Sequence, residues 1–122
     1  MIVLVCGGRD YTARQDAFSC LDSLHGQYRI TGIVEGEARG ADTLAKEWAI
    51  VRGVTLYPHR ADWDTHGKKA GHMRNTAMLK NNPPPTYCVA FPGGRGTSDM
   101  VSKAKAAGLV VWQPYLLGEN NG

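Results

Sequence analysis

The sequence predicts one α/β domain over residues 1–122: a Rossmann-like, doubly wound parallel sheet of about five strands, in the order 3-2-1-4-5, with helices on both faces. Short apolar segments alternate with longer segments of helical periodicity. The first segment, residues 1–6, is apolar throughout, which is typical of a strand buried on both faces of a parallel sheet. Glycine-bearing turns join strands to helices at several points, where such folds bind their ligands.

The strand 1–6 leads through a glycine turn into a helix from Thr12 to His25-Gly26. Thr12 and Gln15 have the spacing of a capping box, in which two side chains satisfy free N–H groups at a helix start. We expect the apolar face of this helix to comprise Ala17, Phe18, Leu21 and Leu24.

A second strand is predicted at residues 31–35, and the helix that follows the turn 36–42 should end at Gly53. Its apolar stripe comprises Ala41, Leu44, Ala45, Trp48 and Val51. A third strand, residues 54–57, stops at Pro58.

A polar loop, residues 59–67, precedes a helix expected from about Lys68 to Asn81. Its inner face should comprise Ala70, Met73, Ala77 and Met78. The prolines at 83–85 form a stiff connector.

The last part of the chain predicts a strand at residues 86–90, a glycine-rich loop at 91–97 and a helix at 98–107. Gly108 caps that helix, and residues 109–112 form the fifth strand. The tail from about residue 114 is expected to be weakly ordered.

Composition and charge exclude several classes of protein. The chain is 43% hydrophobic and 20% charged, with a formal net charge of +3. This mild charge argues against nucleic-acid binding, and no apolar run approaches the ~20 residues that cross a bilayer. The start lacks a basic leader, and the three cysteines lack C-x-x-C spacing, which favours a cytoplasmic protein with reduced, buried thiols. The histidines lack metal-site spacing, and no metal or cofactor is expected.

The loop 91–97 carries the clearest chemical signal, because Gly93, Gly94 and Gly96 stand where a strand meets a helix. Glycine allows close approach of the backbone to a ligand. The free N–H groups and the dipole at a helix start attract anions. The loop therefore predicts a phosphate seat, and the alternative is a tight turn whose glycines only relieve steric strain.

With the strand order 3-2-1-4-5, strands one and four adjoin where the order reverses. The turns 7–10 and 92–97 should then face each other, flanked by the turn 36–42. The first turn lacks G-x-G-x-x-G and the chain lacks G-x-x-x-x-G-K-[ST], so neither an ordinary dinucleotide site nor a P-loop hydrolase is predicted.

The segment Pro92-Gly93-Gly94-Arg95-Gly96-Thr97 matches the P-G-G-x-G-T motif of the "lonely guy" phosphoribohydrolases. These enzymes belong to the SLOG superfamily, together with the DNA-processing protein DprA. As far as Gly108, the chain resembles more closely the small YspA and YpsA-related SLOG proteins of bacteria and phages. The motifs that carry this resemblance are G-G-R-D from Gly7, A-R-G-A-D from Ala38, A-D-W from Ala61, H-G-K-x-A-G from His66 and R-N-x-x-M from Arg74.

The resemblance implies a Rossmann-like fold that binds a nucleotide-derived ligand, with its phosphate on the P-G-G-x-G-T loop. Arg74 and Met78 match a helix that supplies a catalytic Arg in the phosphoribohydrolases, but Asn75 replaces its Lys. Those enzymes also carry a Glu where this chain has Met100. Asp99 is one residue early and would point about 100° away on a helix. This departure puts hydrolysis in doubt and leaves phosphate binding untouched.

Other side chains could serve the site. Asp10 and Asp42 could bind a ribose hydroxyl or position water, or they could instead stabilise a turn and a helix start. Arginines suit phosphate or carboxylate, although Arg39 could also form a surface ion pair. Trp63 could stack on a base or cover the edge of the core, and His66 is a possible site residue.

The expected site combines backbone and side chains of three turns and one helix. If the protein is an enzyme, the catalytic candidates are Arg74, Asp10 and Asp42. The ligand-binding candidates are Gly7, Gly8, Arg9, Asp10, Arg39, Gly40, Ala41, Asp42, Arg74, Asn75, Pro92, Gly93, Gly94, Arg95, Gly96 and Thr97.

Three functions remain open at this point. The first is a module that senses, carries or sequesters a nucleotide-derived small molecule. The second is a nucleotide N-glycosidase or nucleoside 5′-monophosphate phosphoribohydrolase, and the third is single-stranded nucleic-acid binding, which needs a basic groove with aromatic side chains. Related proteins pair through helices, so a homo-oligomer is also expected.

Overall fold

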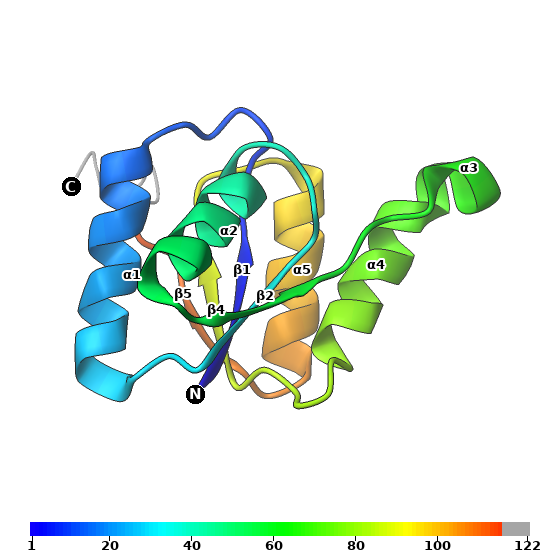
Figure 1. Ribbon diagram of the computed structural model, residues 1–122. Coiled ribbons are helices and arrows are strands. Elements are labelled where there is room, and N and C mark those ends of the chain that lie inside the picture. Colours follow the sequence, from blue (N-terminus) through cyan, green and yellow to red (C-terminus); the bar gives the residue numbers. More distant parts are fainter. Residues whose placement is uncertain (116–122) are drawn as a thin grey trace.

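A five-stranded parallel sheet lies between two layers of helices in the computed structural model, which describes residues 1–115 (Figure 1). The strand order is β3-β2-β1-β4-β5, which confirms the predicted topology. The strands are β1 (Ile2–Cys6), β2 (Gly32–Glu35), β3 (Thr55–Pro58), β4 (Tyr87–Ala90) and β5 (Val110–Trp112). The helices are α1 (Arg14–Tyr28), α2 (Ala41–Arg52), α3 (Trp63–His66), the 3-10 turn η1 (Gly67–Lys69), α4 (Ala70–Leu79) and α5 (Arg95–Ala106).

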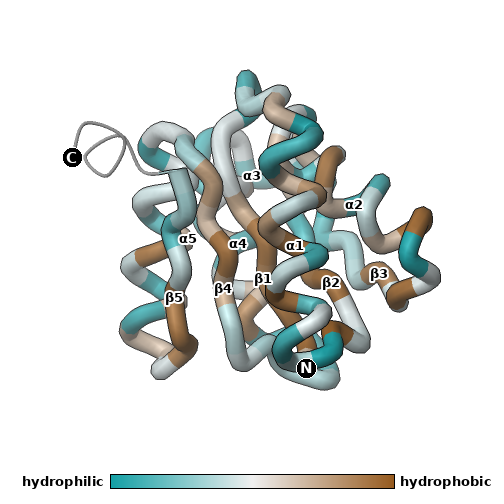
Figure 2. Tube along the Cα trace, turned by 90° about the vertical axis from the view of Figure 1, so that its left-hand side faces the viewer, coloured by the Kyte–Doolittle hydropathy of each residue, from teal (hydrophilic) through white to brown (hydrophobic). Residues whose placement is uncertain are grey.

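Each face of the sheet has its own apolar core. Helices α1 and α2 pack on the face that carries Val3 and Val5, and Trp48 is fully buried there. Helices α4 and α5 cover the opposite face, which carries Leu4 and Cys6. Successive strand residues point to opposite faces, so an apolar run such as β1 can serve both cores. Figure 2 shows the hydrophobic colour concentrated on the strands, between helices of more polar colour.

The register of the central strands brings their carboxyl ends together. Cys6 of β1 pairs with Ala90 of β4, so the chain leaves both strands at the same level. The strand β3 lies at an edge and includes Pro58, which the sequence places just outside it. An edge strand tolerates proline because one side of it needs no N–H donor.

The first helix differs from its prediction at both ends. It begins at Arg14, and its N-cap residue Ala13 makes no side-chain cap, so the capping box of Thr12 and Gln15 is wrong. The helix also continues through Gly26 to Tyr28 and ends at Arg29, which has a φ of 58°. Burial of the following residue, Ile30, fixes this end, because its N–H donates to His25 Nδ1 at 2.9 Å. Packing thus overrides the glycine stop signal.

The predicted loop and helix between residues 59 and 81 are also corrected. The loop contains α3 and η1, and the regular helix α4 spans only Ala70–Leu79. Met73 is 48% exposed and Ala77 is exposed, while Asn75 is buried, so the inner face is rotated from the one predicted. The rotation reflects packing of α4 against α5 as well as the sheet, since the Asn75 amide donates to Asp99 of α5. In α2, Val51 is likewise exposed, and Ala49 is buried instead.

The three cysteines are free and buried, as expected. Pro114 is buried and Tyr115 packs against the core beside α1, while the remainder of the expected tail lies outside the described residues. In residues 1–115, no helix has the length and apolar character needed to cross a membrane.

Candidate functional site

The helix α5 begins at Arg95 and not at Ser98, so Gly96 and Thr97 belong to its first turn. Its N-cap residue is Gly94, which has no side chain to cap the first N–H groups. Uncapped N–H groups and the helix dipole favour an anion at this point. The early start moves part of the expected loop into the helix and places the phosphate-seat candidates around its first turn.

Three turns meet at the carboxyl end of the sheet, as the strand order predicts. The Gly8 N–H donates to the Pro92 carbonyl at 2.9 Å, which joins the turn after β1 to the turn after β4. The Ala41 N–H donates to the Gly8 carbonyl at 3.1 Å, which joins the turn before α2 to the same point. A Cβ on Gly93 would lie 2.6 Å from the Gly8 nitrogen, so the backbones can touch only because these residues lack side chains.

Beside this junction lies a crevice of about 420 Å³. Ten of the predicted site residues line it: Gly7, Gly8, Arg9, Asp42, Arg74, Asn75, Gly94, Arg95, Gly96 and Thr97. Six others do not line it: Asp10, Arg39, Gly40, Ala41, Pro92 and Gly93. Of these, Gly40, Ala41 and Gly93 hold the turns together. Asp10 and Arg39 form an ion pair of 3.1 Å, with side chains that are 93% and 72% exposed.

Asp42 and Arg74 line the crevice as charged groups held by hydrogen bonds to the turn before α2. Asp42 is 6% exposed, and burial raises its pKa to about 6, although an N–H from Ala38 and the charge of Arg74 act in the opposite direction. Arg74 donates to the Gly36 carbonyl and to Asn75 Oδ1. A Cβ on Gly36 would lie 2.9 Å from Asp42 Oδ2 and from the Arg74 guanidinium carbon. Gly36 was not among the predicted site residues, yet it makes room for both side chains.

Behind the same turn lies a second buried carboxyl, Glu35. It is fully buried, and its Oε2 accepts the Glu37 N–H at 2.9 Å, while its Oε1 has no hydrogen-bond partner among the described residues. Burial is the main cause that raises its pKa, to about 7. Glu35 thus supports the turn before α2 from inside the protein.

Neither Met100, which stands where the phosphoribohydrolases have a Glu, nor the neighbouring Asp99 lines the crevice. Met100 is 1% exposed and packs in the core between α5 and the sheet. Asp99 bonds Asn75, Lys103 and His72, and these contacts outweigh its partial burial and lower its pKa. Asp42 is therefore the one carboxylate among the described residues that line the crevice.

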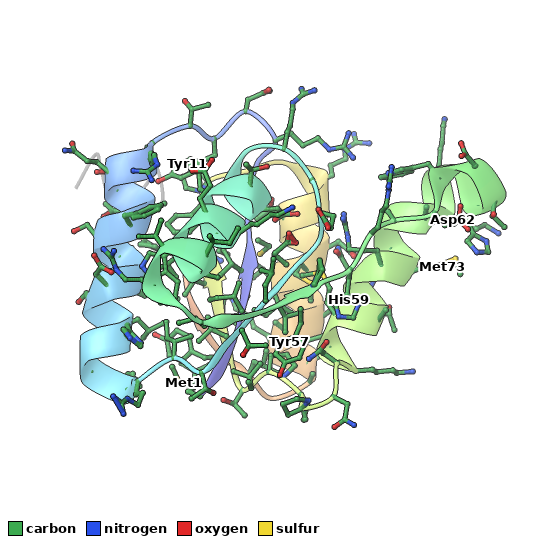
Figure 3. The ribbon with its side chains drawn as sticks, viewed as in Figure 1. Met1, Tyr11, Tyr57, His59, Asp62 and Met73 are labelled. Carbon is green, nitrogen blue, oxygen red and sulfur yellow. The ribbon has the colours of Figure 1, made fainter. Side chains whose placement is uncertain are left out.

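One wall of the crevice comes from the segment 63–72, which contributes no residue to the predicted ligand-binding set. Trp63, Lys68, Gly71 and His72 line it, from α3, η1 and the start of α4, which extend beyond the edge of the sheet in Figure 1. In Figure 3, Asp62 and Met73 mark this projecting end. The motifs around Ala61 and His66 carried the signal, but His72 and not His66 lines the crevice.

The wall presents a partly exposed aromatic ring, that of Trp63. Trp63 is 45% exposed, and the Arg9 guanidinium carbon lies 5.4 Å from the centre of its ring. Residues 62–69 are all exposed, and the buried residues Ala61 and Ala70 flank them. This segment therefore does not pack into the core. Within residues 1–115, no group of three or more His, Cys, Asp or Glu side chains is placed to hold a metal ion.

The model of the YspA, cpYpsA-related SLOG family matches residues 1–66, which is more than half of the chain. The chain belongs to this SLOG family. It is also 40% identical over 117 residues to Gene 61 protein of Mycobacterium phage D29, and the match covers 89% of this chain and 92% of the phage protein. No solved structure matches the chain. Membership of the family supports a role in binding or processing a nucleotide-related ligand.

Proposed function

We propose that this SLOG protein binds a nucleotide or nucleotide-derived ligand and that the phosphate of the ligand lies against the N-terminus of α5. The protein then acts as a sensor, carrier or sequestering module. The observation that carries the proposal is the empty space beside two glycines at the start of this helix. A Cβ on Gly94 or Gly96 would meet no protein atom within 4 Å.

Neither a left-handed φ nor contact with neighbouring atoms explains these two glycines. Gly94 has a φ of −103°, outside the left-handed region that favours glycine, and Gly96 lies in the first turn of α5, where alanine also has a helical conformation. Both line the crevice. Glycine at these positions keeps the first N–H groups of α5 accessible to a bound anion.

The charges around the crevice favour a phosphate. Four basic side chains line it, and they oppose the single carboxylate of Asp42: Arg9, Lys68, Arg74 and Arg95. Guanidinium groups bind phosphate oxygens in a bidentate manner, and Arg74 is already oriented by its bond to Gly36. The volume of about 420 Å³ is within the usual range for a small-molecule site, and Trp63 offers a ring on which a base could stack.

The test is Gly94→Val. We expect it to reduce the affinity for nucleoside 5′-monophosphates by about 100-fold, because the side chain occupies the space beside the helix N–H groups. Isothermal titration calorimetry with a panel of these nucleotides measures the effect, and circular dichroism checks the fold. Gly26→Val in α1 is the matched control, since Gly26 also faces open space. Unchanged affinity in a folded Gly94→Val protein would refute the proposed seat.

Asp42 favours a second candidate function, cleavage of the N-glycosidic bond of a nucleoside 5′-monophosphate. A carboxyl with a pKa of about 6 is mostly ionised at neutral pH and can take a proton from attacking water. A carboxylate can also stabilise the positive charge that develops on the sugar. Under this alternative the wild type releases free base, and Asp42→Asn stops the release while phosphate binding persists. Chromatography of the nucleotides after incubation with the protein measures the free base. If none of the nucleotides releases its base, the activity is excluded.

A further inference from the structure

We infer that the ligand carries a second phosphate group and that this group binds a cluster of four arginines beside the crevice. The cluster comprises Arg9, Arg39, Arg60 and Arg74. The inference rests on the proposed function, because the first phosphate occupies the site at the N-terminus of α5, here called the α5 seat. It adds the class of ligand: a nucleotide with two separated phosphates.

The four arginines line a second cavity, of about 320 Å³. This cavity adjoins the crevice, since both are lined by Arg9, Ala38, Trp63 and Arg74. A single ligand could therefore occupy the two cavities together. Arg39 and Arg60 line the second cavity and not the crevice, so they distinguish the two anion positions.

The arginines come from four separate parts of the chain. Arg9 follows β1, Arg39 precedes α2, Arg60 follows β3 and Arg74 lies in α4. Four positive charges around one cavity repel one another unless anions lie among them. Such a gathering from unrelated segments indicates a binding surface more than a chance surface pattern.

Three neighbouring acids, Asp10, Glu37 and Asp42, offset only part of the charge of this cluster. Glu37 is the one acid among the described residues that line the cavity, and its carboxylate lies 3.8 Å from Lys46 Nζ. Asp10 pairs with one nitrogen of Arg39, which leaves other N–H donors of that group available. Asp42 lies near Arg74 on the crevice side. Arg60 makes no hydrogen bond or ion pair through its side chain within residues 1–115, so its donors are available.

Trp63 is shared by the two cavities. Its ring lines both cavities, and the Arg9 guanidinium lies over it. A nucleoside stacked near Trp63 would have one phosphate toward α5 and another toward Arg60. Nucleoside 3′,5′-bisphosphates and 5′-phosphorylated dinucleotides carry two separated phosphates, and mononucleotides with one phosphate lack the second.

The experiment compares adenosine and guanosine 5′-monophosphates with the corresponding 3′,5′-bisphosphates and with phosphorylated dinucleotides, by calorimetry at physiological salt. We expect the wild type to bind a two-phosphate ligand at least about tenfold more tightly than the monophosphate. The double variant Arg39→Gln/Arg60→Gln should remove this advantage, and its affinity for the monophosphate should stay within about twofold of the wild-type value. Arg29→Gln, which changes the charge of an exposed arginine outside both cavities, should change neither affinity.

The outcomes separate the inference from the proposed function. If the monophosphate binds and no two-phosphate ligand binds more tightly, the inference is overturned and the α5 seat stands. An advantage that persists in the double variant also overturns it. If no nucleotide binds the wild type, both the proposed function and the inference are wrong.

Discussion

Two groups of glycines lie near each other in space at the carboxyl end of the sheet, and they differ in what surrounds them. Gly8, Gly40 and Gly93 form a seam in which the turns touch, and a Cβ on any of them would overlap a neighbouring backbone. Gly94 and Gly96 face the crevice, where a Cβ would meet no protein atom within 4 Å. Contacts between the turns explain the first group, whereas no contact with neighbouring atoms explains the second, which we propose to be kept free for a ligand.

The largest effect is expected at the seam. Gly40 has a φ of 79°, and a Cβ there would lie 2.6 Å from the Arg9 carbonyl carbon. Gly40→Ala should therefore lower the free energy of unfolding by about 3 kcal/mol or more, as urea denaturation would show. Gly53→Ala is the control, because Gly53 has a φ of 69° but faces open space. Equal losses in the two variants would mean that backbone strain, and not the contact between turns, explains the glycine.

A pH experiment tests the buried carboxyl behind the seam. The pKa of Glu35 is raised to about 7, so the folded state holds a proton that the unfolded state releases near pH 4. The stability from this group is complete below about pH 4 and is lost as pH rises through about 7. Glu35→Gln should thus remove a fall in unfolding free energy on the order of 2 kcal/mol between pH 5 and pH 8.

Asp42 provides the comparison for this experiment. Its raised pKa, about 6, gives the same sign of pH dependence, but Asp42 lines the crevice and Glu35 does not. Glu35→Gln should therefore leave nucleotide affinity unchanged, whereas Asp42→Asn should change stability and alter nucleotide affinity without abolishing phosphate binding. A stability profile of Glu35→Gln that remains parallel to the wild type would show that Glu35 stays ionised when folded.

The smallest expected change in unfolding free energy is at Gly96, where stability and nucleotide binding should change in opposite directions. Alanine is favoured over glycine in a helix, so Gly96→Ala should raise the free energy of unfolding by about 0.5–1 kcal/mol. Gly26→Ala in α1 should raise it similarly, since both positions face open space within a helix. Only Gly96→Ala should weaken nucleotide binding. If both variants bind as the wild type does, Gly96 does not contact the ligand.

The parts of the site that the sequence predicted depend on topology and turn chemistry. Alternating strands and helices predicted the doubly wound parallel sheet, and the order 3-2-1-4-5, once adopted, brings the turns at Gly8 and Pro92 together. The parts it missed depend on tertiary packing. The inner face of α4 could not be read from apolar spacing, because the buried Asn75 bonds Asp99 across to α5.

By itself, the sequence determined the α/β architecture, the junction of three turns and the absence of the expected acid at position 100. These follow from local propensity, the right-handed βαβ connection and side-chain identity. The tertiary structure alone decided which glycines pack and which face open space, that Trp63 walls the crevice, and that four arginines from distant segments share one cavity. Such properties arise from distances between residues far apart in the chain, which no local pattern records.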